Sequence, residues 1–161
     1  MSKSTVIKDF PASGHDHTLC IEDAIAKAQE ICTERGERFT ELRRTVLEIL
    51  WRSHRPMKAY EVLEALSATG RRPAPPTAYR ALDFLIDVGL VHKIESINAY
   101  VGCSDPESGH SGHFLICVEC GDVAELANKA IDKRISEGAK QIGFEVLDQK
   151  IEIEGRCQAC R

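Results

Sequence analysis

The sequence lacks any hydrophobic run long enough to cross a membrane. Its 161 residues contain no uninterrupted apolar stretch of about 18 residues, the length that a membrane-spanning helix needs. The first residues, MSKSTVIKDFPASGHDH, also lack the apolar segment of a secretory signal. We therefore expect a cytoplasmic protein that does not associate with a membrane.

The chain also lacks an overall excess of positive charge, because its net charge is −4, which by itself argues weakly against nucleic-acid binding. The distribution of charge says more. Residues 35–80 carry ten Lys/Arg against five Asp/Glu, whereas residues 101–161 carry seven against eleven. A basic front half and an acidic back half indicate two domains with separate tasks, although a mixed solvated surface would give a similar count.

Motifs of the common enzyme classes are missing as well. We find no Ser/His/Asp order and no phosphate-binding glycine loop. A zinc deaminase needs H-x-E followed by P-C-x-x-C. Here no histidine is followed two residues later by glutamate, and Ile116 rather than proline precedes Cys117. We therefore expect a protein that is not an enzyme.

The front half shows the periodicity of several short helices followed by a hairpin. Apolar residues recur at helical spacing in four segments, and two short β-like runs follow them. The expected helices are 20–36, 41–54, 59–69 and 77–89, and the expected strands are 90–94 and 99–103. This order is typical of a winged helix-turn-helix domain, in which the last helix enters the major groove of DNA. A small helical bundle would show a similar pattern.

The back half alternates strands with one helix, so the fold class expected for the whole chain is α+β. The expected elements are strands 113–118 and 123–126, a helix 127–143 and a final strand 144–155. The polar, glycine-rich segment DPESGHSG separates the two halves. We expect a flexible tail at 1–18, a winged-helix domain at 19–103, a hinge at 104–112 and a small α/β dimerisation domain at 113–161.

Seven cysteines in a cytoplasmic chain point to metal ligation or redox chemistry rather than to structural disulfides. Four of them form two C-x-x-C pairs, Cys117 with Cys120 and Cys157 with Cys160. Each pair offers two sulfurs from one tight turn, and two pairs complete the tetrahedron that zinc prefers. We expect a structural zinc site here. The spacer of 36 residues is longer than usual, so redox dithiols and unrelated cysteines stay as alternatives.

A second group of donors lies around the junction between the two halves: His92, Cys103, His110, His113 and Glu125. Taken singly, each has an ordinary structural explanation. Together, a thiolate, imidazoles and a carboxylate suit Zn²⁺ better than iron or manganese, which prefer histidine and carboxylate alone. A site that takes groups from both domains would favour the conformation that brings them together, so metal occupancy would act as a conformational signal.

Three stretches extend this interpretation: PPTAYRALDFL at 75–85, GLVHKIES at 89–96, and AYVGC before the first C-x-x-C pair. With these motifs the chain resembles the ferric uptake regulator family of metal-responsive repressors, and within it the zinc-sensing members. Iron-sensing relatives carry a dense histidine cluster before the first pair, where this chain has only HSGH. An iron- or peroxide-sensing member is the nearest alternative, followed by a thiol-redox sensor that uses Cys20, Cys32 or Cys103.

The resemblance implies a homodimer with two zinc ions per subunit. Structural zinc would be held by the four cysteines of the two pairs, and the implied regulatory ligands are His92, Cys103, His110 and Glu125. Between His110 and His113 we favour His110 from its distance to Cys117. The implied DNA contacts are Thr77, Tyr79 and Arg80. With zinc bound, the dimer would grip an AT-rich palindrome, the operator of zinc-uptake genes, and block transcription.

Overall fold

The structure is a computed structural model that describes residues 5–10, 17–53, 55–109 and 112–161. The chain forms two compact units. One, here called the winged-helix unit, runs from Pro11 to Glu107, and the other, the C-terminal unit, combines Met1–Phe10 with Ser108–Arg161. None of the described helices is both long enough and apolar enough to span a bilayer.

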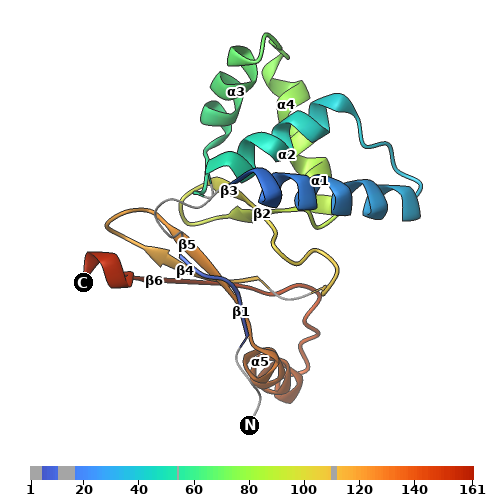
Figure 1. Cartoon of the computed structure of the whole chain (residues 1–161). Helices are drawn as coiled ribbons and strands as arrows, with labels where there is room; N and C mark the ends of the chain where they lie inside the picture. Colours follow the sequence, from blue (N-terminus) through green and yellow to red (C-terminus); the bar gives the residue numbers. More distant parts are fainter. Residues whose placement is uncertain (1–4, 11–16, 54, 110–111) are drawn as a thin grey trace. The chain divides into compact units, whose positions relative to one another are not determined.

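The winged-helix unit contains the four helices and the hairpin that the periodicity predicts (Figure 1). Its elements are α1 (His17–Glu34), α2 (Glu41–Ser53), α3 (Ala59–Ala68), α4 (Pro75–Asp87), β2 (Val91–Ile94) and β3 (Ala99–Gly102). Local chemistry sets the boundaries. Thr40 caps α2, because its Oγ1 accepts a hydrogen bond from the backbone N–H of Arg43 at 3.4 Å. Gly89 follows α4 with a φ of 79°, a left-handed conformation that glycine adopts without strain.

A single apolar core holds this unit together. Most residues of the apolar stripes are no more than 1% exposed, on α2 (Val46, Leu47, Leu50), on α3 (Val62, Leu66) and on α4 (Leu82, Leu85). The remaining stripe residues, Leu42, Leu63 and Ile86, are partly buried against them. Burying one such side chain contributes about 1.5–3 kcal/mol relative to leaving it in water. The fold of this unit therefore rests on ordinary helix packing.

The hairpin is fastened to the helices at two points. Met57 exchanges two backbone hydrogen bonds with Tyr100 on β3, at 2.9 and 2.8 Å. At the end of β3, a Cβ on Gly102 would lie 2.5 Å from Nε1 of Trp51 on α2. Only glycine fits this close approach between strand and indole. The wing thus has a fixed position on the helical core.

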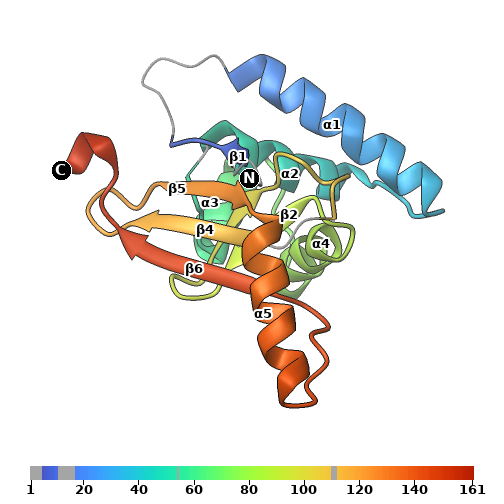
Figure 2. The same ribbon diagram turned by 90° about the horizontal axis from the view of Figure 1, so that it is seen from below.

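The C-terminal unit is a four-stranded sheet with one helix. Its elements are β1 (Thr5–Lys8), β4 (Gly112–Cys117), β5 (Val123–Ala127), α5 (Lys129–Gln141) and β6 (Lys150–Gly155). The strand order is β1-β5-β4-β6, with β4 and β6 parallel and the other neighbours antiparallel. A parallel pair needs a crossover connection, and α5 forms part of it; Figure 2 shows the helix at one end of the strands.

Three expectations differ from the structure. The helix expected at 77–89 begins at Pro75 as α4, because proline fits the first turn of a helix, where a backbone N–H would have no intrahelical partner. The first 18 residues were expected to form a flexible tail, but Thr5–Lys8 is a strand and α1 begins at His17. Those four residues acquire strand structure because β5 offers them an open edge. The final strand starts at Lys150 instead of residue 144. Lys150 pairs with Gly112, the first residue of β4, so the preceding residues would run past the end of their partner strand.

Candidate metal centres and nucleic-acid surface

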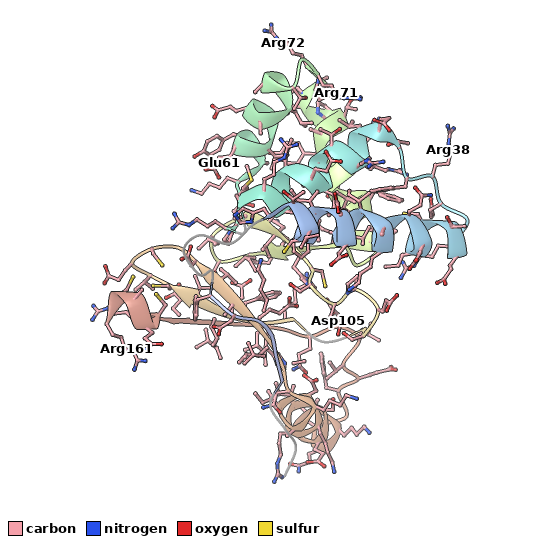
Figure 3. All side chains as sticks on the ribbon, viewed as in Figure 1. Arg38, Glu61, Arg71, Arg72, Asp105 and Arg161 are labelled. Atoms are coloured by element: carbon pink, nitrogen blue, oxygen red, sulfur yellow. The ribbon has the colours of Figure 1, made fainter. Side chains whose placement is uncertain are left out.

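The two C-x-x-C pairs meet at one end of the C-terminal sheet. Cys117 ends β4, and Cys120 follows in a turn that Gly121 closes with a φ of 76°. Cys157 and Cys160 lie in and beside the short helix η1 (Gln158–Cys160), just beyond β6. Because β4 and β6 are parallel neighbours with Cys117 opposite Gly155, both pairs emerge at the same edge. Figure 3 shows sulfur atoms gathered there, near Arg161.

The spacing of the four sulfurs fits a tetrahedral metal site. All four lie within 4.8 Å of one another, and Sγ of Cys120 lies 3.8 Å from Sγ of Cys157. A tetrahedron with Zn–S bonds of about 2.3 Å places its sulfurs about 3.8 Å apart, whereas a disulfide needs about 2.05 Å. All seven cysteines are free thiols. The geometry therefore supports the predicted zinc site over paired disulfides.

The thiols of this group differ in acidity. Backbone N–H groups of Cys120 and Cys157 lower the pKa of Cys117 to about 6, so its thiolate is present at neutral pH. Contact with the Cys157 side chain, together with burial, raises the pKa of Cys160 to about 12. Four crowded sulfurs do not all ionise by themselves. A divalent metal would stabilise the thiolates and displace their protons.

His92 and Cys103, two of the expected regulatory ligands, lie close together on the wing. His92 is on β2 opposite Val101, and Cys103 follows β3 with its N–H bonded to Leu90 O at 2.9 Å. A ring nitrogen of His92 and the sulfur of Cys103 lie within 4.8 Å of each other. The hairpin register therefore brings an imidazole and a thiol together from residues 11 apart in the chain.

Glu125 and His110 complete the set of four expected regulatory ligands. Glu125 is on β5 of the C-terminal unit, opposite Phe114 on β4. His110 lies outside the described residues. The set of four as a whole therefore stays a prediction.

His113, the alternative to His110, has partners within the C-terminal unit. Its side chain is 1% exposed, and its Nε2 lies 2.9 Å from Oδ1 of Asp132 and 3.3 Å from Nε2 of Gln149. Gln149 also donates to Asp132 at 2.9 Å. These contacts connect β4, α5 and the approach to β6. Sequence reasoning missed Asp132 and Gln149, since no spacing rule relates three residues that only the crossover brings together.

The three expected DNA contacts lie on the exposed face of α4. Thr77, Tyr79 and Arg80 are all exposed, with Tyr79 at 45%, while Ala78 and Leu82 face the core. Among the residues that the structure describes, Arg80 has no ion-pair partner. Proline occupies the first two positions of α4, where a backbone N–H would have no partner within the helix, so its missing N–H costs no hydrogen bond. The fold thus presents a polar helix face of the kind that reads a major groove.

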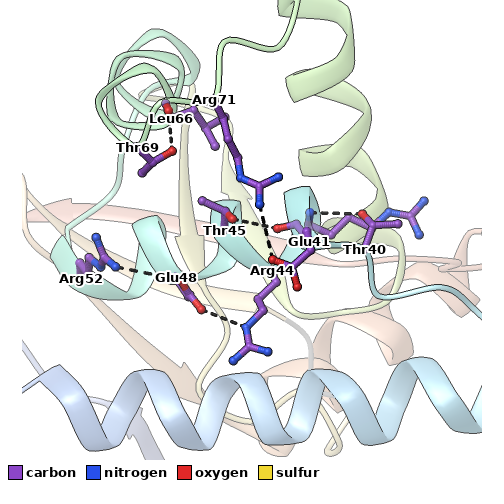
Figure 4. A network of polar contacts seen from close by, with 10 residues as sticks. Thr40, Glu41, Arg44, Thr45, Glu48, Arg52, Leu66, Thr69 and Arg71 are labelled. Carbon is purple, nitrogen blue, oxygen red and sulfur yellow. Dashed lines mark hydrogen bonds and ion pairs between the residues drawn. The ribbon is translucent and has the colours of Figure 1, made fainter.

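Other arginines of the basic region are already engaged by carboxylates. Arg44 lies 3.1 Å from Glu48 on α2, and Arg71, before α4, lies 3.5 Å from Glu41 (Figure 4). By contrast, Figure 3 shows Arg72 projecting outward at the turn between α3 and α4. Because paired arginines contribute less positive potential, the local charge count overstates the positive potential that this surface offers to DNA.

α4 is also held in place by cation–π packing. The guanidinium of Arg43, on α2, lies 3.3 Å from the centroid of the Phe84 ring. The same guanidinium donates to the backbone carbonyl of Arg38. A second arginine, Arg35, donates to the carbonyl of Asp87 at the end of α4, at 3.2 Å. These contacts position the helix whose outer face carries the expected DNA contacts.

Comparisons with known proteins agree with this arrangement. A family model described as "Ferric uptake regulator family" matches residues 34–154. The "Zinc uptake regulation protein" of Escherichia coli (strain K12) is 36% identical over 140 residues, which are 86% of this chain and 82% of that protein. The "Ferric uptake regulation protein" of Pseudomonas aeruginosa is 34% identical over 99 residues, which are 60% of this chain and 72% of that protein.

Solved structures show the same likeness. "Zinc Uptake Regulator Complexed With Zinc AND DNA" matches with a TM-score of 0.83 and 35% identity, over 86% of this chain and 93% of that one. "Crystal structure of holo XcZur" matches with a TM-score of 0.80 and 40% identity, over 86% and 96%. Because the family model spans well over half of the chain and the sequence relatives agree with it, the chain belongs to the ferric uptake regulator family.

Proposed function

We propose that this chain is a zinc-responsive transcriptional repressor whose zinc-loaded homodimer binds palindromic operators of zinc-uptake genes. One structural observation carries the choice of metal: the thiol of Cys103 lies beside the imidazole of His92 on the wing, apart from the four-cysteine cluster. A thiolate in a regulatory site favours Zn²⁺ over iron or manganese. The likeness to zinc uptake regulators over 86% of the chain supports the same choice.

Two zinc ions per subunit have separate roles in this proposal. Cys117, Cys120, Cys157 and Cys160 hold a structural zinc that fastens the C-terminus to the end of β4. Four thiolates leave no open position, which is typical of structural rather than catalytic zinc. The regulatory zinc is held by His92, Cys103, His110 and Glu125. The contacts of His113 with Asp132 and Gln149 support His110 as the histidine from the hinge.

The homodimer forms through the C-terminal unit. No residue of α5 is buried, yet the helix carries an apolar stripe at helical spacing that includes Ile131 and Ile135. Beyond this helix Phe144 is 60% exposed and Leu147 is 89% exposed, and Ile153 on the edge strand β6 is 47% exposed. Exposed apolar residues grouped around one helix and a free strand edge fit a second copy of the same chain.

Zinc regulates DNA binding by restricting the winged-helix unit. The regulatory ligands come from both units, so binding one ion limits how each winged helix is oriented relative to the dimer. DNA-binding dimers of this kind contact two half-sites about 34 Å apart, or a multiple of that distance. Without zinc, DNA must order the two helices, which costs affinity. Such coupling is typically about 1–3 kcal/mol, and by linkage DNA must tighten zinc binding equally.

The decisive experiment is a mobility-shift assay on the chain's own promoter region, with zinc titrated against a chelator. We expect DNA binding that requires zinc, and we expect Cys103→Ser to lose zinc-dependent DNA binding while remaining a folded dimer with its structural zinc. Cys20→Ser is the matched control, since Cys20 belongs to neither donor group. Normal zinc-dependent binding by Cys103→Ser would show that the regulatory assignment is wrong.

The same assay decides the metal. Operator binding is compared under Zn²⁺, Fe²⁺ and Mn²⁺, together with metal analysis of the natively purified protein. We expect zinc to support binding at the lowest free-metal concentration. A preference for Fe²⁺ or Mn²⁺ would instead make the protein an iron or peroxide sensor of the same family.

A further inference from the structure

The strand β1 comes from the start of the chain but belongs to the C-terminal sheet. It pairs antiparallel with β5, placing Thr5 opposite Ala127, Val6 opposite Leu126 and Lys8 opposite Glu125. The register shifts between Val6 and Lys8, so one extra residue is accommodated at this point. β1 also lies outside residues 34–154, the part that matches the family model. The family match therefore does not include this strand.

Glu125 is the residue on which this pairing acts. On one side β5 pairs with β4, with Glu125 opposite Phe114, and on the other side β5 pairs with β1, with Glu125 opposite Lys8. Without β1, β5 would be the edge of the sheet, with its outer N–H and C=O groups unpaired. Edge strands of five residues open more readily than strands paired on both sides, because fewer hydrogen bonds hold them. β1 thus fixes the backbone that carries Glu125 from both sides.

We propose that β1 is a positioning strand for the regulatory zinc site: by pairing with β5 beside Glu125 it holds this ligand in place and raises the affinity of that site for zinc. The inference rests on the proposed function, because Glu125 is a ligand in that proposal. Supporting groups behind a metal ligand typically change affinity about 10- to 100-fold when they are removed, since the free ligand must then be ordered by the metal. The four-cysteine site lies at the ends of β4 and β6, whereas β1 pairs with Glu125, Leu126 and Ala127, so we expect that site to keep its zinc without β1.

The test replaces residues 5–8 by Gly-Ser-Gly-Ser in the full-length protein, which keeps the chain length but removes strand preference. Val6→Thr is the matched control, because a β-branched residue retains that preference. Hydrogen exchange at the amides of Val123–Ala127 reports whether β5 has lost its partner. Competition with a zinc-binding dye, after the four-cysteine site is loaded, reports the affinity of the second zinc.

We expect the Gly-Ser variant to exchange faster along β5 and to bind the second zinc about 10-fold more weakly. Its structural zinc, its dimer mass and its operator binding at saturating zinc should equal those of the parent protein. Unchanged exchange along β5 would overturn the inference, because β1 would then not protect that strand. Faster exchange with unchanged zinc affinity would equally overturn it.

The variant Glu125→Gln, made in the parent chain, tests the proposed ligand set separately from the role of β1. Glutamine retains the size of the side chain but removes its charge. If Glu125→Gln binds the second zinc as tightly as the parent, Glu125 is not a ligand, and both the ligand set and the role of β1 are wrong. If Glu125→Gln weakens zinc binding while the Gly-Ser variant does not, the ligand set stands and only the role of β1 is overturned.

Discussion

The two units of this protein are stabilised in different ways. The winged-helix unit closes its own apolar core, in which Leu47 and Leu85 are fully buried. The C-terminal unit buries a smaller set around Phe114, its α-helix α5 has no buried residue, and its four C-x-x-C cysteines gather at one end of the sheet. The winged-helix unit forms a core from its own side chains. The C-terminal unit has clustered thiols that a metal ion would bind and exposed apolar residues that a second copy of the chain would cover.

This difference matches the tasks that we propose for the units. A recognition helix must keep its shape on DNA, and contacts such as Arg43 over Phe84 hold α4 to the helical core without any metal. A unit whose stability depends on zinc and on dimerisation changes its folded population when zinc or the second copy binds, because a ligand that binds only the folded form shifts the folding equilibrium towards it. In our proposal the regulatory zinc takes ligands from both units, and the rigid winged-helix unit then transmits the change to DNA. Four substitutions test the comparison.

The largest effect is expected from Cys117→Ser, which removes one ligand of the structural zinc. Zinc in sites of this kind contributes about 10–16 kcal/mol of apparent binding free energy, so the C-terminal unit should unfold while the winged helix keeps its helical content. Zinc analysis and circular dichroism at neutral pH measure both. Cys20→Ser should retain the parent's zinc content. If Cys117→Ser stayed folded and kept its full zinc content, the C-terminal unit would not depend on this zinc site, and the proposed difference between the units would be wrong.

The next effect is expected from Ile135→Glu on the apolar stripe of α5. A carboxylate there would have to be buried without a partner when two copies associate, so the dimer should dissociate into folded monomers. Sedimentation equilibrium measures the mass. Lys133→Glu, on the exposed polar side of the same helix, is the control and should stay dimeric. A dimer that persists in Ile135→Glu would place the interface elsewhere.

Leu85→Ala should destabilise the winged-helix unit by about 2–5 kcal/mol, because it leaves a cavity beneath the recognition helix. Chemical denaturation followed by circular dichroism gives the free energy of unfolding, and Leu19→Ala, at a side chain that is 67% exposed, should change it little. The loss should be the same with and without added chelator. A loss that depended on zinc would mean that the two units do not have separate sources of stability.

The smallest effect is expected from Arg80→Ala, which should weaken operator binding by about 1–3 kcal/mol if this guanidinium reads a base. Fluorescence anisotropy with wild-type and base-substituted operators measures affinity and base preference together. Arg134→Ala, an exposed arginine of the C-terminal unit, should leave both unchanged. If Arg80→Ala had the same affinity and the same base preference as the parent protein, a residue other than Arg80 would make the base contact.

Much of the winged-helix unit could be predicted because its signals are local. Helical spacing identified the buried faces of α2, α3 and α4, and Gly89 lies just past the end of α4, but the start of α4 at Pro75 was expected two residues later. The spacing of the two C-x-x-C pairs likewise predicted that four cysteines come together, and their sulfur atoms lie within 4.8 Å of one another. Prediction was poorer where pairing partners decide the structure. Residues 144–149 look like part of a strand, yet β4 is too short to pair with them.

The sequence by itself determined the two-part organisation, the inward helix faces and the types of donor available to metals, because periodicity and spacing are written along the chain. Only the tertiary structure decided that Thr5–Lys8 pairs with the strand carrying Glu125, and that His113 lies against Asp132 and Gln149. These contacts join residues from 19 to more than 100 positions apart. Which strand lies beside which depends on free edges and on the crossover through α5, and no local pattern in the chain encodes that choice.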